Sequence, residues 1–223
     1  IGNKRASRRS WRNARRAADA SKDLELAVWV RGREASIASW EGRPAAAVTE
    51  LLDDSIRLAQ DRPCKGLATV LETKARHLAV QGRADDALGA LNALTDLYER
   101  LPADVTTDRI STFGVPEEVL WFTRGYVYAH LGDSRQASTA VDQALSLCPA
   151  EKKGGRANIN LIRSLAMVRD HDVRDGLNHA LTSVEGLPLT SSRRHLIDQI
   201  IKSLPDQVRT QPAVHHLRTL QLT

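Results

Sequence analysis

Apolar residues recur along this chain with the period of an α-helix. Between Trp121 and Tyr128 the apolar and small positions fall at i, i+4 and i+7, which places them on one stripe of a helix. Ala and Leu are abundant and aromatic residues make up 4% of the chain, a composition that favours packed helices over β-sheets. The sequence therefore predicts an all-α fold. The expected helices are Ser10–Ala20, Leu26–Trp40, Leu67–Gln81, Ala84–Leu97, Ala157–Arg169, Ser192–Ser203 and Pro212–Leu220.

The segment from Trp121 to Pro149 matches the tetratricopeptide (TPR) pattern, a unit of about 34 residues that folds as a helical hairpin. The turn Gly132-Asp133 is expected to end the first helix, because glycine tolerates the positive φ of a helix C-terminus. An ordinary αα-hairpin is the plainer alternative, and it leaves the all-α prediction unchanged. The matching residues, at positions 4, 8, 11, 20, 27 and 32 of the unit, are Trp121, Gly125, Tyr128, Ala137, Ala144 and Pro149.

Weaker versions of this unit surround Gly42, Gly82 and His171, each of which is predicted to lie at a hairpin turn. Their spacings are wider than one TPR unit, which indicates degenerate repeats with insertions. The predicted fold is therefore an α-solenoid of degenerate TPR-like helical hairpins. We expect residues 1–22 to form a basic segment that ends a truncated hairpin, residues 23–190 to form about four hairpins, and residues 191–223 to form capping helices.

The longest break between predicted helices is Leu101–Glu118, which contains Pro102, Gly114 and Pro116. A long loop within a compact array is often functional. A passive linker is an equal alternative at this stage.

Positive charge is concentrated at the start of the chain. The net charge is +5, and residues 1–22 hold eight basic residues against Asp19 alone, so the remainder is close to neutral. Such a segment can contact nucleic acid, acidic lipid or an acidic protein, and a solvated helix face is the plainer alternative. The candidate nucleic-acid contacts are Arg5, Arg8, Arg9, Arg12, Arg15 and Arg16.

The sequence lacks the motifs of catalysis, of metal binding and of membrane insertion. It contains no P-loop, HExxH or GxSxG motif, so we expect a protein that is not an enzyme and uses no cofactor. Cys64 and Cys148 lack the spacing of a metal site and suit the reduced thiols of a cytoplasmic protein. No apolar run reaches about 18 residues, so no membrane span is expected.

Binding is the function that the TPR pattern favours. In TPR arrays the first helix of each hairpin lines a concave groove, and a groove that combines aromatic and charged side chains suits a peptide, a small amphipathic ligand or a protein partner. Arginine can hold a carboxylate through its fork of N–H donors. Burial by neighbouring helices, or simple solvation, is an equal alternative for any one residue. The mapped groove residues are Trp29, Arg33, Trp40, Glu72, Arg76, Phe122, Tyr126, His130, Asn158 and Arg169.

Three segments, Trp29–Ala35, Ser111–Glu117 and Tyr126–Asp133, resemble the TPR-like C-terminal regions of actinobacterial helix-turn-helix transcriptional regulators of the XRE type. The resemblance extends over most of the chain and implies a sensing and protein-interaction domain of a gene regulator. In that family DNA is read by a preceding domain that this sequence does not contain. Because the chain begins with Ile1 rather than Met, we expect a truncated start.

Three alternatives stay open. They are a constitutive protein scaffold, direct nucleic-acid contact through the basic segment, and a homodimer.

Overall fold

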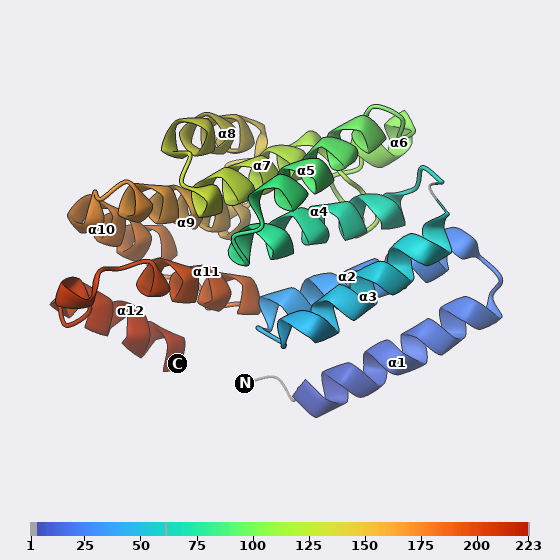
Figure 1. Cartoon of the computed structure of the whole chain (residues 1–223), viewed down its shortest axis with the longest axis horizontal. Helices are drawn as coiled ribbons and strands as arrows, with labels where there is room; N and C mark the ends of the chain where they lie inside the picture. The colour runs from blue at the N-terminus through green and yellow to red at the C-terminus, as the bar shows by residue number, and fades with distance from the viewer. Residues whose placement is uncertain (1–3, 61, 223) are drawn as a thin grey trace. The chain divides into compact units, whose positions relative to one another are not determined.

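The chain folds entirely into helices over the residues that the computed structural model describes, which are 4–60 and 62–222, without the side chains of residues 4, 5 and 222. Twelve α-helices and one 3-10 turn, η1, pack largely as sequential neighbours within this range (Figure 1). The all-α prediction is confirmed. The elements are α1 (Lys4–Ala20), α2 (Leu24–Trp40), α3 (Ala45–Ala59), α4 (Lys65–Val80), α5 (Ala84–Tyr98), α6 (Ala103–Thr106), α7 (Glu117–Leu131), α8 (Ser134–Leu147), α9 (Lys153–Arg169), α10 (Val173–Val184), α11 (Ser191–Lys202), η1 (Asp206–Val208) and α12 (Pro212–Leu222).

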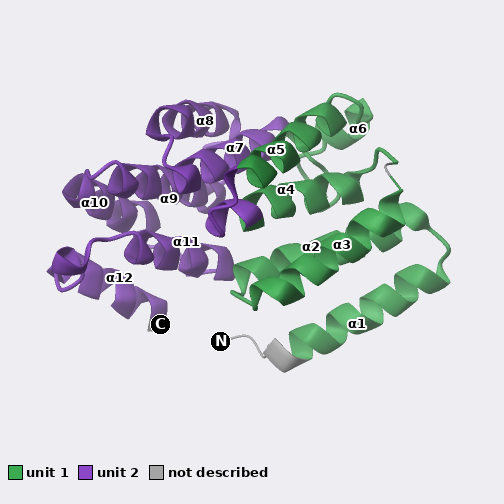
Figure 2. Ribbon diagram, in the orientation of Figure 1, with its two compact units in different colours: residues 1–77, 85–116 green, residues 78–84, 117–223 purple. Residues whose placement is uncertain are grey.

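The helices group into two compact units (Figure 2). Unit 1 comprises residues 1–77 and 85–116, and unit 2 comprises residues 78–84 and 117–223. In unit 1, α2 packs against both α1 and α3. In unit 2, α9 packs against α7, α8, α10 and α11, so it forms the centre of that unit.

Four of the turns between consecutive helices share one backbone geometry. The first or second residue after the helix has a positive φ, with values of 65° at Gly42, 72° at Gly82, 83° at Gly132 and 68° at His171. This conformation lets a later N–H reach back and satisfy a carbonyl of the last helical turn, as in a Schellman motif. The predicted turn positions are thus confirmed. The hydrogen bonds join the N–H groups of Arg43, Arg83, Asp133 and Asp172 to the carbonyls of Ala38, Leu78, Tyr128 and Met167.

We expect His171→Gly to raise the free energy of unfolding by about 1 kcal/mol, because glycine adopts a positive φ without the steric cost that a Cβ imposes. Gly132→Ala should lower it by a similar amount for the same reason. Urea denaturation of both variants checks this pair. Changes in the free energy of unfolding that have the same sign in both variants would contradict the steric explanation.

Small residues bring α7 and α8 into close contact within unit 2. A Cβ at Gly125 would lie 3.2 Å from Cγ2 of Val141, so the two helices approach closely there and a larger residue would require Val141 to shift. Ala137 and Ala144 are fully buried on α8. Small residues of the Trp121–Pro149 segment therefore lie where α7 and α8 approach each other.

Two helix starts differ from the prediction by more than two residues. The basic segment belongs to a helix that begins at Lys4, six residues before the expected start at Ser10. Gly154 and Gly155 lie in the first turn of α9, which begins at Lys153 and not at the expected Ala157. Glycine is tolerated there because the first turn of a helix depends least on intrahelical hydrogen bonds.

Candidate binding site

The predicted groove residues of unit 1 include a buried cation, Arg76 of α4, which is 1% exposed. Its Cζ lies 4.3 Å from the ring centroid of Trp40, and its Nη2 lies 3.0 Å from Oε1 of Glu72. The same nitrogen lies 3.5 Å from Oγ of Ser36 on α2. A buried guanidinium is tolerated when it is paired and hydrogen-bonded in this way. Arg76 therefore connects α2 and α4, and an incoming carboxylate would have to compete with Glu72.

A second cluster in unit 1 is more accessible and surrounds Trp29 of α2. The ring centroids of Trp29 and Phe113 are 4.6 Å apart, and Nζ of Lys65 lies 4.6 Å from the centroid of Phe113. Cζ of Arg33 lies 5.9 Å from the Trp29 centroid. Phe113 is 38% exposed and Ile110 is 98% exposed. This aromatic and cationic surface includes Phe113 and Lys65, which sequence mapping onto first-helix positions missed.

The loop that carries Phe113 is held by its own hydrogen bonds. The carboxylate of Asp108 accepts hydrogen bonds from the side chain and N–H of Ser111 and from the N–H of Ile110, and these bonds lower the pKa of Asp108. The Val115 N–H donates to the Val105 carbonyl at 2.9 Å. A Cβ at Gly114 would collide with the Asp108 carbonyl, so glycine is required there. The long break in the sequence is thus a folded loop, and its length was a sequence signal for the part of this surface that Phe113 contributes.

The predicted groove residues of unit 2 lie on α7 and α9. The side chains of Tyr126 and His130 stack with centroids 4.2 Å apart, and the Phe122 ring lies 6.5 Å from that of Tyr126. Tyr126 and His130 are 1% and 6% exposed, whereas Phe122 is partly exposed and Arg169 is exposed. Phe122 and Arg169 are therefore the residues that a ligand can touch, and Tyr126 and His130 lie beneath the surface.

Helix α11 contributes two further residues to this region of unit 2. The Tyr126 hydroxyl lies 3.4 Å from Nε2 of His195, and the Asn158 amide nitrogen donates to Oγ of Ser192 at 3.4 Å. The predicted groove did not include Ser192 or His195, because residues 191–223 were expected to form capping helices. The structure brings one face of α7, α9 and α11 together, and we call the accessible residues Phe122, Asn158, Arg169 and Ser192 the unit 2 face.

His130 is neutral at physiological pH. Burial lowers its pKa, the nearby charges of Arg169 and His195 add to this effect and a hydrogen bond to the Tyr126 carbonyl opposes it, so that the pKa is about 4. The Nδ1 atom lies 2.9 Å from that carbonyl, which can only accept, so Nδ1 carries the proton. The imidazole therefore acts as a packed aromatic ring with one donor.

A polar hollow of about 360 Å³ also opens in unit 2, between the start of α9 and the end of α10. Lys153, Arg156, His179 and Glu185 contribute to its lining. Arg156 donates to the carbonyls of Leu145 and Cys148 at 2.8 Å, so its charge stabilises the end of α8. The sequence gave no indication of this hollow.

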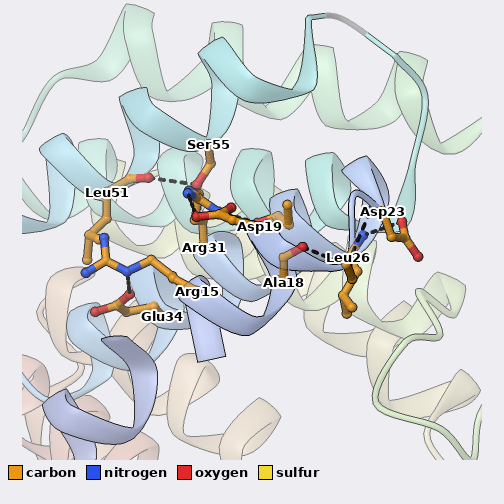
Figure 3. A network of polar contacts seen from close by, with 11 residues as sticks. Arg15, Ala18, Asp19, Asp23, Leu26, Arg31, Glu34, Leu51 and Ser55 are labelled. Atoms are coloured by element: carbon orange, nitrogen blue, oxygen red, sulfur yellow. Dashed lines mark hydrogen bonds and ion pairs between the residues drawn. The ribbon is translucent and has the colours of Figure 1, made fainter. Parts of the chain in front are cut away.

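The candidate nucleic-acid arginines fall into two groups on α1. Arg8, Arg9, Arg12 and Arg16 are exposed. Arg15 instead faces α2, where its Nε lies 3.0 Å from the buried carboxylate of Glu34 (Figure 3). The side chain of Arg5 lies outside the described residues.

Within the described part of the chain, no group of three His, Cys, Asp or Glu residues could hold a metal ion. Cys64 and Cys148 form no disulfide and are buried, and burial raises the pKa of the Cys64 thiol. None of the helices described is long and apolar enough to cross a membrane.

No protein-family model, curated protein or solved structure matches this chain.

Proposed function

We propose that this chain is a non-enzymatic protein-interaction domain that binds a peptide segment of a partner on the unit 2 face. The single observation that carries the proposal is the order of packing in unit 2. Helices α7, α9 and α11 each begin a helical pair, and α9 packs against both of the others. First helices packed in this order form the binding face of TPR-like arrays, and the resemblance to XRE-type regulators favours a role in gene regulation.

The contacts between these helices support a TPR-like repeat. Nζ of Lys152 lies 3.2 Å from Oε1 of Glu118, and Asn158 contacts Ser192; both pairs are separated by 34 residues. This separation is about the length of one TPR unit, as expected where equivalent positions of successive units meet.

The chemistry of the unit 2 face suits a segment with apolar and acidic side chains. Phe122 offers an aromatic anchor and Arg169 an exposed cation, and Asn158 joins α9 to α11 through its hydrogen bond to Ser192. Aromatic residues and arginine provide much of the binding energy at protein interfaces, and arginine pairs with carboxylates through two N–H donors. Buried Tyr126 and His130 hold α7 in place beneath this surface.

Selection of a random peptide library against the purified chain tests the proposal. The selected peptides should contain an apolar residue near an acidic residue, and Phe122→Ala or Arg169→Ala should each weaken their binding about tenfold or more. Phe113→Ala is the matched control, since it removes a partly exposed phenylalanine from unit 1. Loss of binding in Phe113→Ala, with binding unchanged in Phe122→Ala, would move the site to unit 1 and refute the proposal.

Solution scattering with and without a selected peptide separates a sensor from a constitutive scaffold. A sensor must bind its ligand with different affinities in two conformations, so its scattering profile should change on binding. A scaffold should bind the peptide with an unchanged profile.

A further inference from the structure

The exposed side of α1 is a stripe of arginines. On a helical projection of about 100° per residue, Arg8, Arg9, Arg12 and Arg16 fall within a sector of roughly a quarter-turn. Arg8, Arg12 and Arg16 follow one another at intervals of about 6 Å along the axis. All four are exposed, and we call them the α1 stripe.

The opposite side of α1 is fixed to α2. Trp11, Ala14 and Ala18 join an apolar cluster of unit 1 that includes Ala27 and Val30. This packing sets the rotation of α1 about its axis, so the α1 stripe must face outward. The stripe is therefore a property of the packed helix and not only of its sequence.

Ion pairs engage the acidic side chains that contact α1 or lie on it. Glu41, which accepts a hydrogen bond from Ser7, pairs with Arg43. Arg15 engages Glu34, and Nη1 of Arg31 lies 2.9 Å from Oδ1 of Asp19, whose pKa is lowered by the hydrogen bond from Arg31 (Figure 3). No acidic residue precedes Asp19 in the chain. The positive charge of the stripe is therefore available to an external anion.

We propose that the α1 stripe binds the phosphate backbone of duplex nucleic acid without reading its sequence. This interaction is separate from the peptide binding proposed for unit 2. The regular row of guanidinium groups matches a regular row of phosphates, and arginine binds phosphate through two parallel N–H donors. The helix is 17 residues, or about 25 Å, long, so it can span several phosphates.

Other anionic partners fit the α1 stripe less well. The one aromatic residue of α1, Trp11, packs into the cluster with α2, so no ring is free to stack on the bases of a single strand. The exposed positions are polar residues or alanine, which gives no apolar side chain of appreciable size for insertion into a lipid surface. The stripe therefore offers charge and hydrogen bonds alone, which is the chemistry of duplex backbone contact.

Binding of the full chain to a mixed-sequence DNA duplex of about 20 base pairs, longer than α1, tests the proposal. With four phosphates neutralised, the plot of log affinity against log salt should have a slope of about −3.6, equivalent to a loss of about 150-fold between 50 and 200 mM salt. Scrambling the duplex sequence should leave the affinity unchanged. A single strand and vesicles containing phosphatidylserine are the competing probes, and each should bind more weakly than the duplex.

The quadruple variant Arg8→Ala, Arg9→Ala, Arg12→Ala and Arg16→Ala should lose duplex binding. Alanine favours the helix, so circular dichroism should show α1 retained. The matched control replaces four exposed arginines outside α1, namely Arg62, Arg100, Arg135 and Arg174, with alanine and removes the same amount of charge. This control should bind like the unmodified chain.

The four corresponding Arg→Lys substitutions should keep the salt slope but weaken affinity, because lysine keeps the charge and loses the bidentate geometry. Equal loss of binding in the α1 and control variants would show a general charge effect and overturn the proposal. Absence of duplex binding, or tighter binding to the vesicles, would overturn it as well.

Discussion

Gly66→Ala should lower the free energy of unfolding by about 2 kcal/mol, because an added methyl group at this site has no space. A Cβ at Gly66 would lie 2.6 Å from the backbone nitrogen of Trp29 and 2.9 Å from Cγ1 of Val28. A backbone atom cannot move aside as the end of a side chain can, so α2 and α4 must separate. Guanidinium or urea denaturation measures the loss.

The same substitution at Gly89 is the matched control and should have the opposite sign. Gly89 lies within α5, and a Cβ there would meet no atom within 4 Å. Alanine should therefore add about 0.5 to 1 kcal/mol through its greater helix propensity. A gain in stability at both glycines would show that the close approach of α2 and α4 is not required for folding.

Acidification should destabilise unit 2 through His130. Its pKa is about 4 in the folded chain, below the ordinary value of 6.5, so between these values the unfolded chain binds more protons than the folded chain. The stability contributed by neutral His130 is therefore fully present above about pH 6.5 and falls as the pH drops to about 4. A difference of this size corresponds to about 3 kcal/mol. Denaturation at a series of pH values measures the loss.

His130→Gln should flatten this pH dependence, because glutamine does not titrate. Gly132→Ala provides the control: it should lower stability at every pH, yet keep the acid-dependent loss because His130 remains. An unchanged pH profile in His130→Gln would assign the loss to other groups.

The sequence predicted the helices and their turns because both depend on neighbouring residues. Gly42, Gly82 and Gly132 mark turns through their tolerance of positive φ, and Asp133 caps α8 by accepting a hydrogen bond from the Gln136 N–H. His171 was predicted to replace glycine at a turn, and it does so with a positive φ. These features are local, so their signals lie within a few residues of each other.

The candidate sites were less predictable, since they depend on which side of a helix is covered. Arg15 and Arg16 are adjacent in the sequence, but Arg15 pairs with buried Glu34 and Arg16 is exposed. Arg76 and Arg169 were both mapped to a groove, yet the first is buried beside Trp40 and the second is exposed. Charge and spacing alone do not distinguish the members of either pair.

Contacts between distant segments explain the residues that were missed. Phe113 approaches Trp29 across 84 positions of the chain, and His195 approaches Tyr126 across 69. No local pattern encodes such pairs, because they form only when whole helices pack together.

The sequence by itself determined that this protein is helical, where its turns lie and that its positive charge gathers in α1, because periodicity, backbone preference and composition act over short distances. Only the tertiary structure decided which arginines face solvent, which aromatic residues are buried and which helices share a face. Those outcomes depend on the packing of one helix surface against another, and a partial rotation about a helix axis changes the residues that reach solvent.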